Sequence, residues 1–484
     1  MQTKTAVLQN FINGQWSDSA SARVRDIVSP VTGELICQAP YSTAEEIDAA
    51  VAAARKAQPL WEARPAWERA RICHAIADAI ERHKERLCRA LTLEQGKPYE
   101  SEAIPDIEES AELFRIAAED LKRMETAIIP SLDANKRILT FRRANGVYAI
   151  IIPWNFPTLM LAEFAAPALA AGNTIVLKPS EYTPAVIRLF TEIMHEADLP
   201  PGVFNLVYGD GEVGQMLIEH PGIDAVGFIG SHVTAEKIVR AAGLKPTIIE
   251  ASGNGPTIVC EDADLDAAAA GVVHGGFFNA GQVCCATARV LVHEKVHDQL
   301  VERVLIEASK WKLGDPFDKA TKVGPMNNEP VAAKMESHVQ DAVAKGAEVL
   351  LGGKRAANFP TNLYFEPTVI DNVGLDTLIQ QHETFGPIVP IITVKDDEEA
   401  IRVGNDSYLG LQSAVYTGSS ARAFKYMNSL KTGNIVINEH GGYWEPHVPF
   451  GGAAGTRTGW GRIGGRYTML DMTHIRTVIW DFSR

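Results

Sequence analysis

Short apolar segments alternate with segments of helical periodicity through the middle of the chain. "GVYAIIIPW", "NTIVLKP", "VFNLVYG" and "AVGFIG" are strand-like runs, and segments such as "AVIRLFTEIMHEA" between them repeat apolar residues every three or four positions. This alternation is typical of a parallel sheet whose right-handed crossover helices cover both faces. Such sheets bind ligands beyond the carboxyl ends of their strands. We therefore predict an α/β fold with a ligand site at that edge.

The same pattern extends on both sides of this region. A second alternating run, from "TIVCED" to "GNIVIN", begins near residue 257 and predicts a second α/β lobe. Near the N-terminus, the Asn-Gly pair of "FINGQW" predicts a tight hairpin. "STAEEID" opens a helix with a Ser-x-x-Glu capping box at Ser42 and Glu45. A second long helix is expected from about Pro65 to Thr92.

Composition excludes several classes of protein. The 484 residues are 46% hydrophobic and 22% charged, as in an ordinary soluble protein of two or three lobes. A formal net charge of −14 argues against nucleic acid as a partner. No apolar run approaches the roughly 20 residues of a membrane helix. The first twenty residues lack the apolar core of a signal peptide, so we expect a cytoplasmic protein without membrane contact.

Two adjacent thiols, Cys284 and Cys285, stand in "FFNAGQVCCATAR". They are compatible with a metal pair, a disulfide, a redox switch, or one nucleophile beside a bystander. The chain has no C-x-x-C and no H-E-x-x-H, which argues against zinc. "DADLD" begins like a calcium loop, but Ala267 and Val273 replace the required Gly and Glu, so we expect a helix start there. We predict no metal site.

Two loops compete as the site for a dinucleotide. "YGDGEVGQML" contains the spacing G-x-G-x-x-G, but Asp210 and Glu212 lie inside it and would repel a pyrophosphate. Gly230-Ser231 ends a strand directly before a helix, where free backbone N–H groups can face an anion. Lys178 at another strand end can bind ribose or phosphate, and Glu181 near ribose hydroxyls favours NAD. The alternative for this pair is a surface salt bridge.

Six motifs in order carry a family resemblance. They are "PWNFP" at Pro153–Pro157, "KPSE" at Lys178–Glu181, "GFIGS" at Gly227–Ser231, "FFNAGQVC" at Phe277–Cys284, "ETFGP" at Glu383–Pro387 and "PFGG" at Pro449–Gly452. On these motifs the chain resembles the NAD(P)-dependent aldehyde dehydrogenase superfamily over nearly its whole length. The resemblance implies oxidation of an aldehyde to a carboxylic acid.

The resemblance also implies a domain organisation. Residues 1–122 and 145–250 would form a Rossmann-like NAD-binding domain, and residues 251–455 an α/β catalytic domain. Residues 123–144 and 466–484 would form a small β oligomerisation segment of a homodimer or homotetramer. The alternative is that "TVIWDF" near the C-terminus only completes its own domain as an edge strand.

The family's catalytic residues match three positions. Cys284 would be the nucleophile, Asn155 and the Cys284 backbone N–H the oxyanion donors, and Glu250 the base that activates water. Cys285 cannot share the attack, because adjacent side chains point in different directions. Taken singly, Asn155 is compatible with a turn residue and Glu250 with a buried structural carboxylate.

Further positions match the cofactor and substrate sites. Glu383 would bind the nicotinamide ribose, with Phe385 and Trp154 near the ring, so the cofactor-binding set is Trp154, Lys178, Glu181, Gly230, Ser231, Glu383 and Phe385. We expect NAD, with NADP possible. The substrate tunnel would have Phe156, Met160 and Glu163 on one helical face, Phe278, Val283 and Cys285 opposite, and Tyr443 and Trp444 at the mouth.

These tunnel residues predict a short or medium aldehyde that carries a polar group. A purely apolar chain would leave the Glu163 carboxylate unpaired. An anionic semialdehyde requires Arg115 or Arg457 to reach the tunnel. The alternative for Glu163 is a carboxylate that is solvated or paired outside the tunnel.

Two departures from the family pattern bear on function. Ser252 replaces a glycine just after Glu250, and "PFGGAAGTRTG" is two residues longer than the usual motif and lacks its lysine. The competing functions are a coenzyme A-acylating relative, which commonly lacks Glu250, and a non-catalytic protein of the same fold. Glu250 argues against the acylating relative, and the presence of Cys284, Asn155 and Glu250 together argues against the non-catalytic protein.

Overall fold

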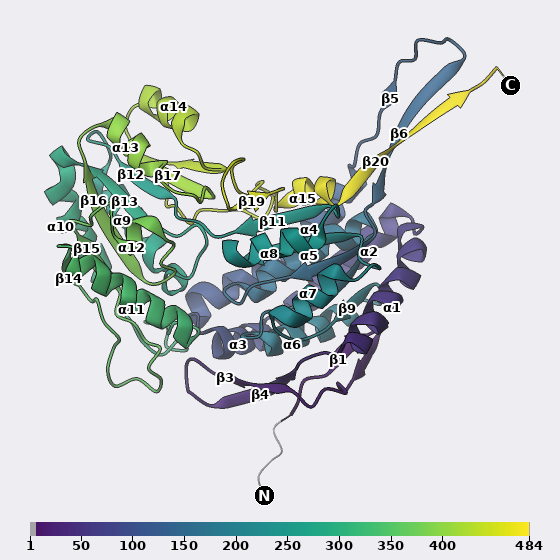
Figure 1. The fold of residues 1–484 in the computed structure, drawn as a ribbon, viewed down its shortest axis with the longest axis horizontal. Helices are drawn as coiled ribbons and strands as arrows, with labels where there is room; N and C mark the ends of the chain where they lie inside the picture. Colours follow the sequence, from purple (N-terminus) through teal and green to yellow (C-terminus); the bar gives the residue numbers. More distant parts are fainter. Residues whose placement is uncertain (1–5, 484) are drawn as a thin grey trace, which may run out of the picture.

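The first lobe is built on an eight-stranded sheet of order β19-β11-β10-β7-β8-β9-β1-β2, in a computed structural model that describes residues 6–483 (Figure 1). Neighbours from β11 to β9 pair in parallel, as predicted, and the outer strands pair antiparallel. The strands are β1 (Asn10–Ile12), β2 (Gln15–Ser17), β7 (Val147–Ile151), β8 (Thr174–Lys178), β9 (Phe204–Leu206), β10 (Ala225–Gly230), β11 (Thr247–Ala251) and β19 (Gly459–Trp460).

The Asn-Gly hairpin is confirmed between β1 and β2. Asn13 and Gly14 have φ of 53° and 78°, and Ile12 pairs with Gln15 directly across the turn. Both residues of a two-residue turn of this kind need positive φ, which Asn and Gly tolerate. The local sequence therefore determines this turn.

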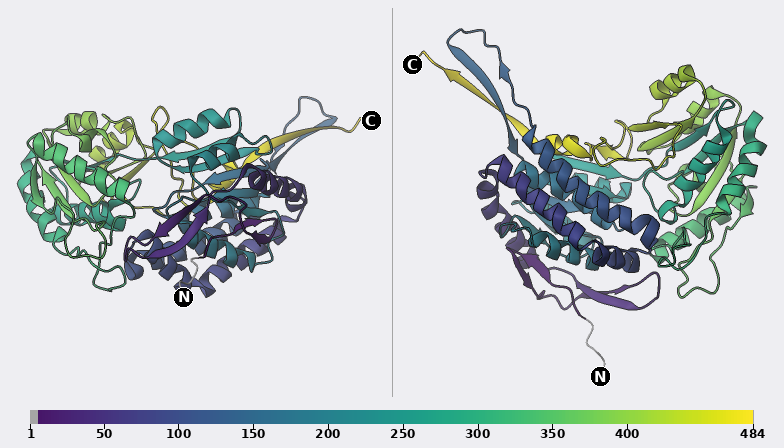
Figure 2. Two further views of the ribbon diagram at one scale, coloured as in Figure 1. Left: turned by 60° about the horizontal axis from the view of Figure 1, so that its bottom comes forward. Right: turned by 180° about the vertical axis from the view of Figure 1, so that it is seen from behind.

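Helices cover both faces of the first sheet (Figure 2). Alternate residues of β7 show this: Tyr148 and Ile150 belong to one apolar cluster, and Val147 and Ala149 to another. The first face carries α2 (Ala66–Arg82), α3 (Lys84–Gln95), α4 (Ile104–Lys122), α5 (Pro157–Ala171) and α6 (Pro184–His195). The second carries α1 (Ala44–Glu62), α7 (Gly211–Glu219) and α8 (His232–Ala242). Within residues 6–483, no helix is both long and apolar enough to cross a membrane.

Two predicted helix boundaries are wrong. The capping box of α1 is formed by Thr43 and Glu46, one residue later than predicted, and Ser42 instead donates to Asn10. The helix expected from Pro65 to Thr92 is two helices, because the backbone breaks at His83 (φ −105°, ψ 13°). The apolar periodicity continues across the break, and the His83 ring contacts Glu196 at 3.0 Å.

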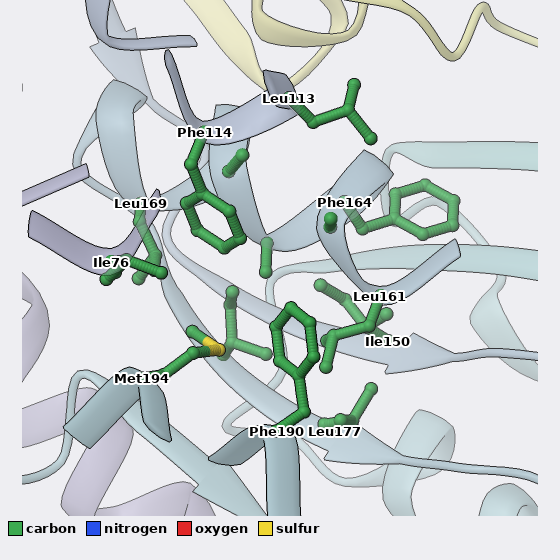
Figure 3. Packing of buried hydrophobic residues seen from close by; sticks show 14 of the residues in the cluster. Ile76, Leu113, Phe114, Ile150, Leu161, Phe164, Leu169, Leu177, Phe190 and Met194 are labelled. Atoms are coloured by element: carbon green, nitrogen blue, oxygen red, sulfur yellow. The ribbon is translucent and has the colours of Figure 1, made fainter. Parts of the chain in front are cut away.

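The largest apolar cluster lies between α2, α4, α5, α6 and the sheet (Figure 3). Side chains from these four helices meet above the strand residues Ile150 and Leu177. Phe114, Phe164 and Phe190 are fully buried in it. This packing holds the N-terminal end of α5 in place, and that end leads into the site described below.

The second lobe has a seven-stranded sheet of order β14-β15-β16-β13-β12-β17-β18, parallel except for β14. Its strands are β12 (Pro256–Val259), β13 (Arg289–His293), β14 (Glu348–Leu351), β15 (Thr368–Asp371), β16 (Ile388–Val394), β17 (Gln412–Tyr416) and β18 (Asn434–Ile437). Its helices are α9 (Leu265–Phe277), α10 (His297–Ala308), α11 (Glu329–Ala344), α12 (Leu378–Gln381), α13 (Asp397–Gly404) and α14 (Ser420–Ser429). "DADLD" is a helix start, as predicted: the Asp264 carboxylate caps α9.

A three-stranded sheet forms an arm that projects from the molecule (Figure 1). It consists of β5 (Ile128–Ile129), β6 (Lys136–Ala144) and β20 (Thr473–Asp481), and β6 pairs with β20 along its whole length. The short helix α15 (Gly465–Asp471) leads into β20. A separate ribbon of β3 (Val24–Val28) and β4 (Leu35–Pro40) lies near the N-terminus.

Candidate active site

The segment that carries the two adjacent thiols leaves α9 through a turn with left-handed backbone. Asn279, Ala280 and Gly281 have φ of 51°, 52° and 68°. A Cβ at Gly281 would lie 1.9 Å from the carbonyl oxygen of Gly386, so only glycine fits there. The turn brings Cys284 to the wall of a cavity of about 440 Å³.

Most residues predicted for catalysis and substrate contact line this one cavity. They are Asn155, Phe156, Met160, Glu250, Phe278, Val283, Cys284, Cys285, Tyr443 and Trp444. The cavity also reaches five of the predicted cofactor residues, Trp154, Gly230, Ser231, Glu383 and Phe385. Cys284 therefore shares one cavity with groups from both lobes.

Glu163 does not line the cavity, in contrast to its predicted place on the tunnel wall. Its side chain is 1% exposed, so it is not solvated either, and burial raises its pKa far above the usual value. Phe156 and Met160 reach the cavity from the first turn of α5. Farther along, α5 is buried all round, and the sequence spacing of Phe156, Met160 and Glu163 does not specify which side faces the cavity.

Hydrogen bonds connect Asn155 to the loop that carries the thiols. The Asn155 side-chain amide donates to the Gln282 carbonyl at 3.0 Å, and the Asn279 amide donates to the Asn155 carbonyl at 3.1 Å. The Gln282 amide donates back to the Asn279 carbonyl at 2.9 Å. Asn155 is 6% exposed, so these bonds orient its amide in a largely dehydrated site.

Glu250 is the penultimate residue of β11, lies near Cys284 and is 2% exposed. Burial, and then the nearby Glu383 carboxylate, raise its pKa to about 8, while a hydrogen bond with Cys284 opposes the shift. The pKa of Cys284 is raised well above its usual value by the Cys285 thiol, by burial and by Glu250. All six cysteines lie within residues 6–483 and are free thiols. Glu250 and Cys284 are thus a buried carboxyl and a neighbouring thiol, and the pKa shift of each favours its protonated form.

Ser252, which stands where the family has glycine, adopts φ of 60°. The Gly253 backbone N–H donates a hydrogen bond to the Glu383 carboxylate at 3.0 Å. Burial raises the pKa of Glu383, and Lys334 opposes that shift. Phe385 packs edge-on against Trp154 with ring centroids 5.6 Å apart. These residues form one end of the cavity.

A groove of about 890 Å³ continues from that end across the first lobe. It shares the lining residues Pro153, Trp154, Ile229, Gly230 and Ser231 with the cavity. Lys178, Glu181, Lys237 and Arg240 line it, as do Asp210, Gly211, Glu212 and Gly214 of the other glycine loop. Ser231 caps the N-terminus of α8.

The residues that line the groove have the chemistry to bind a dinucleotide. It combines a helix N-terminus and three cationic side chains for phosphates with the Glu181 carboxylate for ribose hydroxyls. The Lys178 ammonium is held by the carbonyls of Pro179 and Gly209, both at 2.9 Å. Asp210 and Glu212 are also paired, with Arg23, at 2.8 and 3.2 Å.

Three titratable residues on the other side of the cavity were not predicted from the sequence. They are Glu109 on α4, His274 on α9 and His440. The rings of His274 and His440 lie 4.3 Å apart, and burial and His440 lower the pKa of His274 to about 4. Glu109 follows another glutamate in "PDIEES", and nothing in the sequence shows which of the two faces a cavity.

The two arginines considered for an anionic substrate do not line the cavity. Arg115 pairs with Asp78, Glu81 and Glu112. Arg457 pairs with Glu236 at 3.4 Å. Both arginines therefore form ion pairs with carboxylates outside the cavity.

Comparisons with known proteins agree with this geometry. The model of the aldehyde dehydrogenase family matches residues 16–478. The mitochondrial succinate-semialdehyde dehydrogenase of Arabidopsis thaliana is 37% identical over 97% of this chain and 88% of its own. The NADP(+) succinate-semialdehyde dehydrogenase GabD of Escherichia coli is also 37% identical, over 97% of this chain and 96% of its own. A solved betaine aldehyde dehydrogenase of Staphylococcus aureus with NAD+ has a TM-score of 0.94 at 33% identity, over 98% of this chain and 95% of the other.

Proposed function

The chain belongs to the aldehyde dehydrogenase family and is an NAD(P)-dependent aldehyde dehydrogenase, and we propose that Cys284, Asn155 and Glu250 carry the reaction. The observation that supports these roles is the single cavity that contains all three side chains beside a dinucleotide-sized groove. We further propose that the product is a free carboxylic acid.

Cys284 begins the reaction by attacking the aldehyde carbon. Its proton passes to the deprotonated form of the neighbouring Glu250, and a bond forms between sulfur and carbon as the carbonyl electrons move to oxygen. The Asn155 amide and the Cys284 backbone N–H stabilise the resulting oxyanion. NAD or NADP, when bound, supplies the hydride acceptor, and the carbonyl of a Cys284 thioester then re-forms.

Glu250 then acts on water. Once it has released the proton from Cys284 to solvent, its carboxylate takes a proton from a water molecule as the oxygen attacks the thioester carbon. The bond from carbon to Cys284 breaks, and the acid leaves. The buried Glu250 has a pKa of about 8, near the range in which a base is effective. The same residue argues against the coenzyme A-acylating alternative.

The cofactor would lie along the groove and enter the cavity past Trp154. Lys178, Glu181, Gly230 and Ser231 would hold its adenosine and phosphate groups, and Glu383 its nicotinamide ribose, with Phe385 near the ring. The family uses either NAD or NADP, as the named relatives illustrate. We propose NAD as the preferred form, because Glu181 would repel a 2′-phosphate.

The substrate is proposed to be a short or medium aldehyde with a polar group. Aromatic residues line the cavity, yet the Trp444 Nε1 and His440 Nδ1 atoms are buried without a hydrogen-bond partner among the described residues. A substrate with polar atoms can satisfy such groups, whereas a purely apolar one leaves them unpaired. The names of the relatives favour a second candidate, a dicarboxylic semialdehyde.

A spectrophotometric assay tests both candidates. The formation of reduced nicotinamide is followed with hexanal, a hydroxyaldehyde and succinate semialdehyde, with NAD and with NADP. The hydroxyaldehyde is expected to have the highest kcat/KM. A clear preference for hexanal contradicts the polar-substrate proposal, and a clear preference for succinate semialdehyde establishes the second candidate.

We propose that the arm joins copies of this chain into a dimer or tetramer. The arm exposes large apolar side chains that a monomer would leave in water: Ile128, Leu132, Phe141, Ile475, Ile479 and Trp480. β5 and β20 flank β6 in the arm sheet, so each leaves an unpaired strand edge. Sedimentation of the full chain tests the proposal, and Ile479→Glu is expected to shift the species toward the monomer.

A further inference from the structure

Asn279 is a buried residue through which the first lobe contacts the loop that carries Cys284. It is 1% exposed, and its backbone has a left-handed φ of 51°, which asparagine tolerates. Two side chains of the first lobe bind it: Gln95 Nε2 donates to its Oδ1 at 3.1 Å, and Glu102 Oε1 accepts from its backbone N–H at 2.9 Å. None of these three residues lines the cavity, so any effect on the reaction must pass through a neighbour.

The orientation of the Gln95 amide is determined by the end of α3. Gln95 is the last residue of this helix, and Gly96 follows it with a φ of 103°. The chain turns there, and the Lys97 backbone N–H donates to Gln95 Oε1 at 2.8 Å. A backbone N–H can only donate, so the oxygen of the amide faces Lys97 and its nitrogen faces Asn279. Gln95 is fully buried, where the reversed amide would leave these polar groups unpaired.

The Asn279 amide is oriented by Gln95 in the same way. Because its Oδ1 accepts from Gln95, its Nδ2 is directed to the carbonyls of Asn155 and Gln282, to which it donates at 3.1 and 3.3 Å. The Gln282 carbonyl also accepts the hydrogen bond of the Asn155 side-chain amide. Asn279 therefore holds both the main chain of Asn155 and the group to which the Asn155 side chain donates.

We propose that Gln95 and Asn279 are positioning residues that act on the reaction through the Asn155 amide. This inference rests on the proposed role of Asn155 as an oxyanion donor. The hydrogen bonds run in one direction, from the Lys97 N–H through Gln95 and Asn279, and hold Asn155 before an aldehyde binds. A donor fixed in advance needs no reorganisation when negative charge develops on the substrate oxygen. Loss of either link weakens that stabilisation.

Gln95→Met tests the first link, because methionine keeps the length of the side chain and removes its amide. We expect kcat to fall by about tenfold, while the dissociation constant of the cofactor, measured by equilibrium dialysis, stays unchanged. Asn205→Leu is the matched control. It removes an equally buried amide of the first lobe that bonds only to backbone groups, those of Asn13, Ile175 and Gly202. This control should lower the midpoint of thermal unfolding and leave kcat unchanged.

The same substitution in the Asn155→Ala enzyme separates positioning from a general loss of packing. If Gln95 acts through Asn155, Gln95→Met should change the residual kcat of Asn155→Ala by less than about twofold. Asn279→Asp keeps the shape of its side chain and replaces the Nδ2 donor by oxygen. It should show the same dependence on Asn155, and it decides the test if Gln95→Met does not fold.

Two results overturn the inference: an unchanged kcat in folded Gln95→Met, or an equal loss of kcat with and without the Asn155 side chain. Full activity of Asn155→Ala alone would overturn the proposed role of Asn155, and this inference with it.

Discussion

The side-chain amide of Asn155 donates a hydrogen bond to the carbonyl of Gln282 at 3.0 Å, two residues before Cys284. The bond connects the segment between β7 and α5 of the first lobe to the loop after α9 of the second. One of the two amide protons is used in this contact, which leaves the other for a substrate oxygen. The proposed oxyanion donor and the nucleophile are therefore held as one unit.

Replacement of Asn155 tests this unit. Asn155→Ala should lower kcat by roughly 10²- to 10³-fold, because an oxyanion donor acts mainly on the transition state. Steady-state kinetics with the best aldehyde measure the loss. Asn428→Ala, which removes an exposed amide bonded only to Phe424, serves as the control and should behave like the unaltered enzyme. A decrease in kcat of less than about threefold would show that Asn155 is not an oxyanion donor.

Replacing each cysteine in turn should distinguish the role of Cys284 from that of Cys285. Cys284→Ala should abolish dehydrogenase activity, since no thioester can form. Cys285→Ala should retain substantial turnover with altered substrate preference, because Cys285 lines the cavity without attacking the carbonyl. Activity and circular dichroism of both variants provide the measurement. Equal loss of activity in two folded variants would contradict the assignment.

Glu250→Gln should slow thioester hydrolysis more than hydride transfer. Mixing the variant with cofactor and aldehyde in a stopped-flow instrument should give a burst of reduced nicotinamide, followed by slow turnover. Cys284→Ala should show no burst, which makes it the matched control. Normal steady-state turnover of Glu250→Gln would exclude Glu250 from the mechanism.

The pH dependence of hydrolysis follows from the raised pKa of Glu250. The base must be deprotonated, and its pKa of about 8 means that most of it carries a proton at pH 7. The hydrolysis rate should therefore rise with pH up to about 8 and then level off. Single-turnover rates after the burst, measured from pH 6 to 9.5, check this. If the hydrolysis rate of Glu250→Gln rises with pH in the same way, the pH dependence belongs to another group.

Cofactor preference should depend on Glu181. The unaltered enzyme should have a higher kcat/KM for NAD than for NADP, because a 2′-phosphate would meet the Glu181 carboxylate in the groove. Glu181→Gln should lower the ratio of kcat/KM for NAD to kcat/KM for NADP by about tenfold. Glu192→Gln, at a surface salt bridge with Arg86, should leave the preference unchanged. Preference of the unaltered enzyme for NADP would show that Glu181 does not act on the ribose.

The sequence by itself determined features that depend on neighbouring residues. Asn13-Gly14 makes a two-residue hairpin because both residues tolerate positive φ. The alternation of apolar strands and periodic helices leads to parallel pairing from β11 to β9, since a short crossover helix returns the chain in the same direction. Cys284, Asn155 and Glu250 were predicted as a set from the resemblance of the chain to the aldehyde dehydrogenase family.

The tertiary structure decided which face of a helix meets the cavity. Helical periodicity shows which residues share a face, but α5 is buried on nearly all sides, so spacing alone placed Glu163 on the wrong wall. A carboxylate that was not predicted to line the cavity, Glu109, comes from α4, and the packing of α4 against α5 brings it there. Likewise, the partners of Arg115 include Asp78 and Glu81 on α2, and that of Arg457 is Glu236 on α8. Such contacts between distant segments depend on the packing of whole elements, which no local sequence pattern specifies.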